Sequence, residues 1–285
     1  MAITAEMVKT LRERTGAGMM ECKKALTEAD GDIDAAIEYL RKRGMAQAAK
    51  RAGRNTSEGV VGILVNADRT KGTMAEVNCE TDFVARTDEF KALVDDIVTT
   101  IDATDETHEA LLASDGPLGE RLTAAIATVG ENMAVPRSAR LVGDYIGSYS
   151  HLGGKIGVLV HVDGVTGDAR QHEAFTSFVN ELAMHVAAAS PQYTTRDEVP
   201  AVAVEKEKDI FRAQMAESGK PANVVDKIVE GKLGAFYEQI VLVDQPTIRD
   251  PKVKVSQAVE AVAKVIGQPL VIRGFARFKV GEASA

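Results

Sequence analysis

The sharpest change of hydrophobic pattern along the chain lies between residues 74 and 101. Residues 74–77 (Met-Ala-Glu-Val) alternate in the way that is typical of a half-buried strand. A polar stretch, residues 78–85, follows and contains one aromatic residue. Apolar positions then recur at spacings of three and four, which predicts an amphipathic helix: Phe90, Leu93, Val94, Ile97 and Ile101. We therefore expect Phe83 where a strand gives way to a helix, beside the carboxylate of Asp82.

The local pattern leaves two interpretations of Phe83 open. In the first, the ring belongs to the core, which is the usual place for a lone aromatic residue at the end of a strand. In the second, the ring is exposed and acts as a wedge against a partner, while the Asp82 carboxylate disturbs a charge in that partner.

Residues 1–43 show the pattern of three short helices. Thr4 is a candidate N-cap for the first, and the second is predicted over residues 19–29. The third begins after Asp32 and has one apolar stripe, formed by Ile33, Ala36, Ile37 and Leu40. Gly44 suits the position just after a helix end, so we expect the third helix to stop there.

Met19 and Met20 open the second predicted helix. Adjacent residues on a helix point in different directions. The two side chains are therefore not both core filler, and we expect one of them to be exposed, where a methionine provides an adaptable contact surface.

Residues 45–58 differ in composition from what precedes them and predict a short basic helix followed by a linker. Lys50, Arg51 and Arg54 stand among alanines and polar residues. A solvated cluster is a better interpretation of these charges than a nucleic-acid site, because nucleic-acid binding depends on many cations gathered on one surface.

A weak internal repeat appears at an offset of 85 residues. It relates Gly62 to Gly147, Gly72 to Gly157, Val77 to Val162, Phe90 to Phe175 and Val94 to Val179. In each copy, strand-like runs precede a helix that begins near a phenylalanine. The repeat predicts an α+β fold with two related halves, residues 59–142 and 143–285, built on mainly antiparallel sheets and joined around residues 140–143.

The second half opens with a predicted hairpin over residues 145–160. Two strand-like runs flank a glycine-rich turn, and His151 lies at the tip. A lone histidine in a loop is usually solvated, so the pattern alone gives this residue no role.

Two further helices are predicted over residues 204–218 and 222–240. They flank Gly219-Lys220-Pro221, and such a pair forms an antiparallel helical hairpin over about residues 204–240. A last strand is predicted over residues 274–282.

The net charge of −8 is unevenly distributed. Residues 1–57 carry +3, whereas the remainder carries −11. An acidic body argues against direct nucleic-acid binding and favours a protein partner.

The remaining composition is that of an ordinary soluble protein. Cys22 and Cys79 have no metal-ligand spacing, and a reducing, cytoplasmic compartment explains them most simply. No run approaches the roughly 18 apolar residues of a membrane span. The first residues do not resemble a signal peptide. We expect no membrane association.

The motifs of common enzymes are missing. Gly153-Gly154-Lys155 is not a phosphate loop, because Tyr149 stands at the first glycine position and Ile156 replaces the magnesium-binding hydroxyl residue. No His-Glu-x-x-His and no Gly-x-Ser-x-Gly occurs. We expect no bond chemistry, no metal site and no cofactor.

Two long stretches carry a resemblance to a known family. Residues 78–85 (Asn-Cys-Glu-Thr-Asp-Phe-Val-Ala) and residues 14–26 (Arg-Thr-Gly-Ala-Gly-Met-Met-Glu-Cys-Lys-Lys-Ala-Leu) resemble the motifs of the bacterial elongation factor Ts family, in the same order. The resemblance extends over nearly the whole chain. It implies a ubiquitin-associated-like three-helix bundle over residues 1–44, then the two α+β halves with the inserted helical hairpin. Some members continue into a further C-terminal helix, whose contacts are not carried over because the sequence ends at Ala285.

The function implied by the resemblance is guanine-nucleotide exchange on elongation factor Tu, in its GDP-bound and nucleotide-free forms. In the family pattern, Thr81, Asp82, Phe83 and Val84 displace Mg²⁺ from that GTPase, and His151 contacts the same domain. The N-terminal bundle adds contacts through Arg12, Met19, Met20 and Lys23. The helical hairpin is a candidate surface for pairing two copies of the chain.

The alternative is an adaptor or scaffold that binds proteins without changing nucleotide exchange. It predicts that replacing Phe83 leaves any GTPase unaffected. An enzyme of another type would need a polar pocket with reactive groups, for which the sequence shows no candidate.

Overall fold

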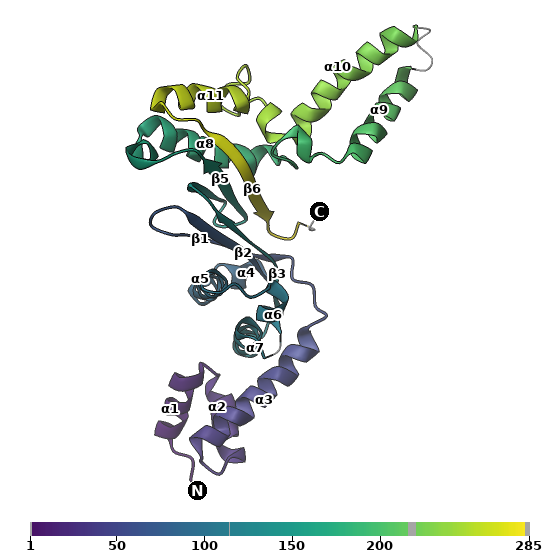
Figure 1. The fold of residues 1–285 in the computed structure, drawn as a ribbon. Helices are drawn as coiled ribbons and strands as arrows, with labels where there is room; N and C mark the ends of the chain where they lie inside the picture. Colours follow the sequence, from purple (N-terminus) through teal and green to yellow (C-terminus); the bar gives the residue numbers. More distant parts are fainter. Residues whose placement is uncertain (1, 114, 216–220, 283–285) are drawn as a thin grey trace.

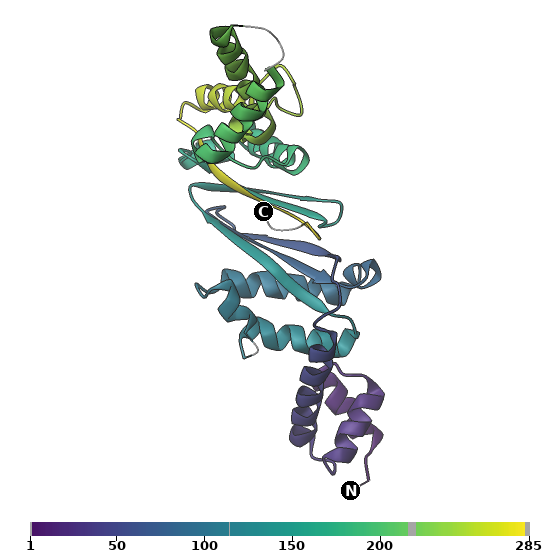
Figure 2. The same cartoon turned by 90° about the vertical axis from the view of Figure 1, so that its right-hand side faces the viewer.

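The computed structural model describes residues 2–113, 115–215 and 221–282. Three parts follow one another along the molecule (Figure 1): a helical bundle at the N-terminal end, two stacked β-sheets with helices on their outer sides, and a projecting helical hairpin at the other end. Figure 2, the view turned by 90°, shows the same succession. The mixed α+β class that the sequence predicts is confirmed.

The first sheet consists of β1 (Glu58–Val65), β2 (Lys71–Cys79) and β3 (Met133–Val142) in the order β1-β2-β3, with antiparallel pairing throughout. Its outer face is covered by α5 (Asp88–Asp102), with α6 (His108–Leu112) and α7 (Pro117–Val129) completing the layer. The buried side chains of α5, among them Phe90 and Val94, form the core beneath it.

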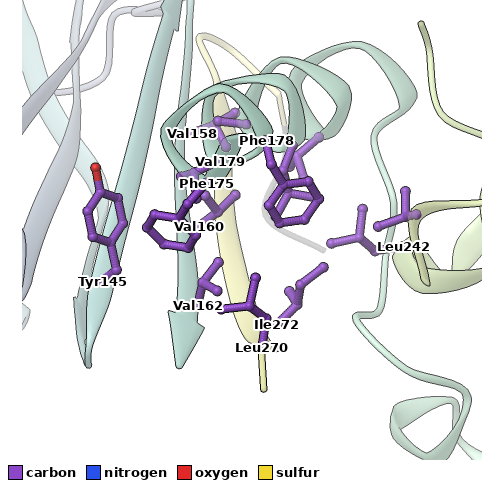
Figure 3. Close-up of a cluster of buried hydrophobic side chains, with 14 of the residues drawn as sticks. Tyr145, Val158, Val160, Val162, Phe175, Phe178, Val179, Leu242, Leu270 and Ile272 are labelled. Carbon is purple, nitrogen blue, oxygen red and sulfur yellow. The ribbon is translucent and has the colours of Figure 1, made fainter. Parts of the chain in front are cut away.

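The second sheet repeats this arrangement with β4 (Tyr145–His151), β5 (Ile156–Asp163) and β6 (Val271–Lys279). Helix α8 (Glu173–Ala189) covers its outer face, and α11 (Val255–Ile266) packs on α8. In the core between the second sheet and α8 (Figure 3), the ring of Phe175 on α8 meets the ring of Tyr145 on β4 edge-on, with 4.8 Å between the ring centroids. Short 3-10 helices connect these elements: η1 (Gly167–Gln171), η2 (Arg196–Glu198) and η4 (Leu242–Asp244).

The two sheets pack face to face through a separate apolar cluster whose centre is Val61, Met74, Ile146 and Leu159. Strand β2 therefore has a helix layer on one face and the other sheet on the opposite face. Its residues from Gly72 to Cys79 are all buried. The half-buried strand predicted from alternation is wrong, because the second sheet covers the face that would otherwise meet water.

The internal repeat is confirmed as two halves of equal topology. Its glycines occupy equivalent places: a Cβ atom on Gly62 would lie 2.5 Å from Val94, and one on Gly147 would lie 2.2 Å from Val179. Each glycine thus lets the covering helix approach its own sheet. Strand β3 ends at Val142 and β4 begins at Tyr145, so residues 143–144 connect the two sheets.

The N-terminal bundle consists of α1 (Ala5–Thr15), α2 (Met19–Glu28) and α3 (Ile33–Arg51) around a small core of its own. The predicted N-cap is confirmed, since Thr4 Oγ1 accepts a hydrogen bond from Met7 N at 3.2 Å. The expected helix end at Gly44 is wrong, because α3 continues to Arg51. Gly44 is buried, and a Cβ there would lie 3.2 Å from Ala127, so the glycine permits close packing on α7.

The helical hairpin is formed by α9 (Ala201–Met215) and α10 (Ala222–Ile240). Lys232 on α10 donates to Gln214 at 2.7 Å and lies over the ring of Phe211 on α9. The predicted turn at Gly219-Lys220 and the predicted helix end at Ser218 lie outside the described residues. Pairing of two copies through this hairpin stays a prediction. Among the described helices, none has the length and apolar character needed to cross a membrane.

The turn after strand β2 as a candidate protein-binding site

Phe83 lies on a one-turn helix, α4 (Asp82–Ala85), between the end of β2 and the start of α5. Its side chain is 79% exposed. The core interpretation of Phe83 is therefore wrong, and the exposed interpretation describes the free protein. An exposed phenylalanine ring offers a large apolar area to a partner, and aromatic residues are enriched in the buried cores of protein interfaces.

The neighbours of Phe83 anchor the turn. Thr81 is the N-cap of α4, and its hydroxyl accepts a hydrogen bond from Val84 N at 3.4 Å. Ala85 is buried, and Val84 packs against the core of the first half. Because these two side chains face the core, the short helix directs the Phe83 ring outward.

Asp82 is partly exposed and forms an ion pair with Arg86 at 2.8 Å, one turn further along. The Arg86 side chain is 78% exposed. An exposed pair of this kind contributes little to stability. The Asp82 carboxylate can therefore exchange Arg86 for a partner's group at small cost.

Glu131 holds the turn from the loop between α7 and β3, and sequence reasoning missed it. Its Oε2 accepts hydrogen bonds from Glu80 N at 3.1 Å and Thr81 N at 3.0 Å, and its Oε1 accepts one from Thr81 Oγ1 at 2.7 Å. No pattern signal points to Glu131, because the contact spans 50 positions and depends on the pairing of β2 with β3.

Glu80 forms the reciprocal contact. Its Oε1 accepts from Asn132 N at 2.6 Å and from the Arg54 guanidinium at 3.3 Å. The hydrogen bond from the Asn132 amide, with Arg54 in addition, lowers the pKa of the Glu80 carboxyl. Arg54 of the predicted basic cluster thus has a structural partner at the site.

Cys79 ends β2 directly before the turn and is buried. Burial, with the Glu131 charge nearby, raises the pKa of the Cys79 thiol to about 11. The thiol therefore stays protonated at neutral pH and is not a nucleophile.

A groove of about 370 Å³ separates the turn from the tip of the β4–β5 hairpin. Asp82, Ala85 and Arg86 line one side, and Leu152 and Gly153 line the other. Leu152 is 71% exposed. The fold thus brings together two segments that are some seventy residues apart in sequence.

His151 is the last residue of β4, immediately before the turn of that hairpin, and is exposed. Its Nδ1 is 3.0 Å from the hydroxyl of Tyr149, whose ring stacks on the imidazole at 5.8 Å. The histidine therefore has a defined orientation at the edge of the surface that carries Leu152.

The N-terminal candidates lie on the bundle, which Figure 1 shows at the opposite end of the molecule from the helical hairpin. Arg12 on α1 and Lys23 on α2 are both exposed. Met19 and Met20 are 60% and 75% exposed, so the expected exposure of one of them is confirmed, and the other is exposed as well. The bundle core is filled by residues such as Leu11 and Leu26, so it contains neither methionine.

Reactive groups do not gather at this site. Within the described residues, no cluster of three or more His, Cys, Asp or Glu side chains has the arrangement needed to hold a metal ion. The arrangement is that of a held, protruding aromatic residue beside a groove, which is suited to protein contact.

Comparison with known proteins identifies the family. The profile of the family described as Elongation factor TS matches residues 80–282. Among curated relatives, the protein named Elongation factor Ts from Trichlorobacter lovleyi is 42% identical, over 99% of this chain and 94% of its own length. Those from Nautilia profundicola and Rhodospirillum rubrum are 44% and 45% identical, each over 98% of this chain and 93% of its own length.

The matched region contains the Phe83 turn, the β4–β5 hairpin and the helical hairpin, and the relatives also cover the N-terminal bundle. The resemblance noted in the two sequence motifs is therefore confirmed at full length. The chain belongs to the elongation factor Ts family of translation elongation factors.

Proposed function

We propose that this chain is a guanine-nucleotide exchange factor that binds elongation factor Tu and promotes release of GDP. The observation that carries the proposal is the 79% exposure of Phe83 on a turn that neighbouring groups hold in place. Such an arrangement presents a rigid apolar wedge, which needs no rearrangement before it enters a partner.

The proposed mechanism acts on the grip of the GTPase on its nucleotide. A GTPase holds GDP through backbone amides around the phosphates and through Mg²⁺. Phe83 inserts between side chains of the GTPase domain and displaces the segment that orders the Mg²⁺ shell. Asp82 adds negative charge nearby, while Thr81 and Val84 hold the turn that carries both residues.

Two further surfaces contribute to binding in this proposal. His151 and the neighbouring hairpin tip extend the contact across the groove beside the turn. Arg12, Met19, Met20 and Lys23 on the bundle add affinity at a distance from the wedge. The location that goes with this proposal is the cytoplasm, where elongation factor Tu acts.

Thermodynamic linkage constrains the mechanism. If the factor weakens GDP binding a thousandfold, which is about 4 kcal/mol, GDP must weaken binding of the factor equally. The factor therefore stabilises the nucleotide-free GTPase and does not select GTP over GDP. The excess of cellular GTP over GDP determines the direction of exchange.

The test is stopped-flow release of fluorescent GDP from elongation factor Tu, with and without this chain. We expect acceleration by orders of magnitude by the wild-type chain and a much smaller acceleration by Phe83→Ala. Ile248→Ala is the matched control, because Ile248 is another exposed apolar residue, 51% exposed, outside the proposed contact.

Circular dichroism and thermal unfolding of both variants distinguish a functional from a structural effect. Phe83→Ala with a wild-type unfolding curve and slow exchange supports the wedge. Binding of the wild-type chain to elongation factor Tu without faster GDP release would contradict the proposal and favour the adaptor alternative.

A further inference from the structure

The antiparallel ladder between β2 and β3 ends at the pair Cys79 and Met133, but the two chains stay joined beyond it. In a continued ladder, Glu80 would face Asn132 and Thr81 would face Glu131. Side-chain carboxylates take the place of backbone carbonyls here: Glu80 accepts from the amide of Asn132, and Glu131 accepts from the amides of Glu80 and Thr81.

We infer that Glu131 is a positioning residue for the exchange reaction. Its carboxylate holds the start of the turn so that α4 presents the Phe83 ring in one orientation. This inference rests on the proposed function, since it concerns the activity of Phe83, and it adds a residue that the family motif around Phe83 does not contain.

Among the described residues, the Glu131 carboxylate accepts three hydrogen bonds, and all three come from the turn. Two are donated by backbone amides and one by the Thr81 hydroxyl, which at 2.7 Å is the shortest. Hydrogen bonds to an ionised carboxylate are about twice as strong as those between neutral groups. Without Glu131, the amides of Glu80 and Thr81 lose the acceptor that they have in the structure.

The Thr81 hydroxyl connects Glu131 to α4. It donates to Glu131 and at the same time accepts from Val84 N, so it is oriented by the carboxylate before it caps the helix. A four-residue helix cannot persist by itself in water. Loss of Glu131 therefore loosens the cap and leaves the short helix held by the packing of Val84 and Ala85 alone.

The consequence for activity follows from the population of the competent turn. If only a fraction of molecules presents Phe83 correctly, the step that Phe83 drives is slowed in proportion to that fraction. Contacts made by the N-terminal bundle do not depend on the turn. Loss of Glu131 should therefore lower the maximal rate of GDP release at saturating factor, with little change in the half-saturating concentration.

The experiment measures fluorescent GDP release from elongation factor Tu over a range of factor concentrations. The variants are Glu131→Ala, Glu131→Gln, Phe83→Ala and the Glu131→Ala/Phe83→Ala double variant of the full chain. Glu109→Ala is the charge-matched control, because Glu109 is an exposed residue of α6 in the same half.

We expect Glu131→Ala to lower the maximal rate about tenfold. A loss of this size is expected when at least one hydrogen bond to a charged group is removed. Glu131→Gln keeps the shape and one acceptor oxygen, so it should retain most of the rate. In the Phe83→Ala background, Glu131→Ala should lower the maximal rate further by less than about twofold, because both changes remove the same interaction. Glu109→Ala should match the wild type.

A merely structural role gives a different result. A folding defect lowers the amount of active factor, which raises the half-saturating concentration and leaves the maximal rate unchanged; that pattern would overturn the inference. Independent, multiplying effects of Glu131→Ala and Phe83→Ala would also overturn it. Failure of the proposed function itself appears elsewhere, as a wild-type chain that does not accelerate release, and it would remove both conclusions.

Hydrogen–deuterium exchange gives a second readout that does not depend on the GTPase. In Glu131→Ala, the amides of Glu80, Thr81 and Val84 should exchange faster, while those of α5 keep their protection. Unchanged protection of the turn would show that Glu131 does not hold it.

Discussion

The carboxylate of Glu76 and the guanidinium of Arg137 form an ion pair, with Oε2 and Nε 2.7 Å apart, although the Glu76 side chain is only 1% exposed. Both residues lie on the first sheet, on β2 and β3. The other Glu76 oxygen accepts from Gly281 N at 2.9 Å, and Arg137 donates to Lys279 O at 2.9 Å. The pair thus connects the first sheet to the end of β6 in the second.

We predict that Glu76→Ala destabilises the protein by about 3 kcal/mol, because removing one partner of a buried pair leaves the other charge uncompensated. Asp105→Ala is the control, since Asp105 also pairs with an arginine, Arg140, at 2.9 Å but is fully exposed. Denaturant unfolding followed by circular dichroism measures both. Equal, small effects of the two substitutions would contradict the structural role of the Glu76 pair.

Gly147 provides a test of the repeat. An alanine there would place its Cβ 2.2 Å from Val179 Cγ1, so we predict that Gly147→Ala costs about 1–3 kcal/mol through overpacking beneath α8. Gly62→Ala should behave alike in the other half. Gly274→Ala is the control, because a Cβ at this strand position meets no atom within 4 Å. Thermal unfolding should show a larger loss of stability in Gly147→Ala and Gly62→Ala than in Gly274→Ala.

His185 predicts a pH dependence of stability. It is buried in α8, its Nε2 is 2.8 Å from Gln245 Oε1, and its Nδ1 has no hydrogen-bond partner. Burial lowers the pKa of His185, although the hydrogen bond that its Nε2 donates to Gln245 Oε1 opposes the shift. Protonation would add a buried charge and a donor without an acceptor.

The sign follows from linkage. Because the pKa of His185 is lower in the folded protein than in the unfolded chain, the unfolded chain binds the proton first. The contribution of His185 is complete above the unfolded pKa of about 6.5 and is lost as the pH falls through the folded pKa, by at most about 1.4 kcal/mol per pH unit. Denaturant unfolding at pH 7 and pH 5 should show a smaller loss in His185→Gln than in the wild type.

Met19 and Met20 should contribute to the affinity for elongation factor Tu and not to the rate of GDP release at saturating factor. Because both thioethers are exposed on the bundle, we predict that Met19→Ala/Met20→Ala raises the half-saturating concentration for GDP release about tenfold, as expected for loss of two interface side chains. The maximal rate should stay unchanged. Met45→Ala, at a residue that is 50% exposed on α3, is the control. A lowered maximal rate would place the bundle in the release step itself.

Most of the elements, and the relationship between the two halves, follow from signals in the sequence. Spacings of three and four around Phe90 define α5, and glycine and valine positions repeated at an offset of 85 predict two halves of one topology. These signals are local or periodic. They are visible in the sequence because each element buries one face, which gives its apolar residues a regular spacing. The two long motifs were enough to identify the family.

Which side chains are exposed depends on contacts between elements that are distant in the sequence. The pattern could not choose between a buried and an exposed Phe83, because the answer depends on how Val84 and Ala85 fill the core. Both methionines at the start of α2 are free because other residues complete the bundle core. Strand β2 is buried on both faces because a second sheet, encoded more than sixty residues later, covers it.

The same reason explains α3 and Glu131. The local pattern around Gly44 predicts a helix end. The glycine lies inside α3 instead, because α3 packs so closely on Ala127 of α7 that a side chain at position 44 is unfavourable. Glu131 has no local signature, since its acceptor role exists only once β2 and β3 are in register. Periodicity in the sequence indicates which face of an element is apolar. Contacts between distant segments determine what covers that face, and they also bring together groups such as Glu131 and Thr81 beyond the end of the β2–β3 ladder.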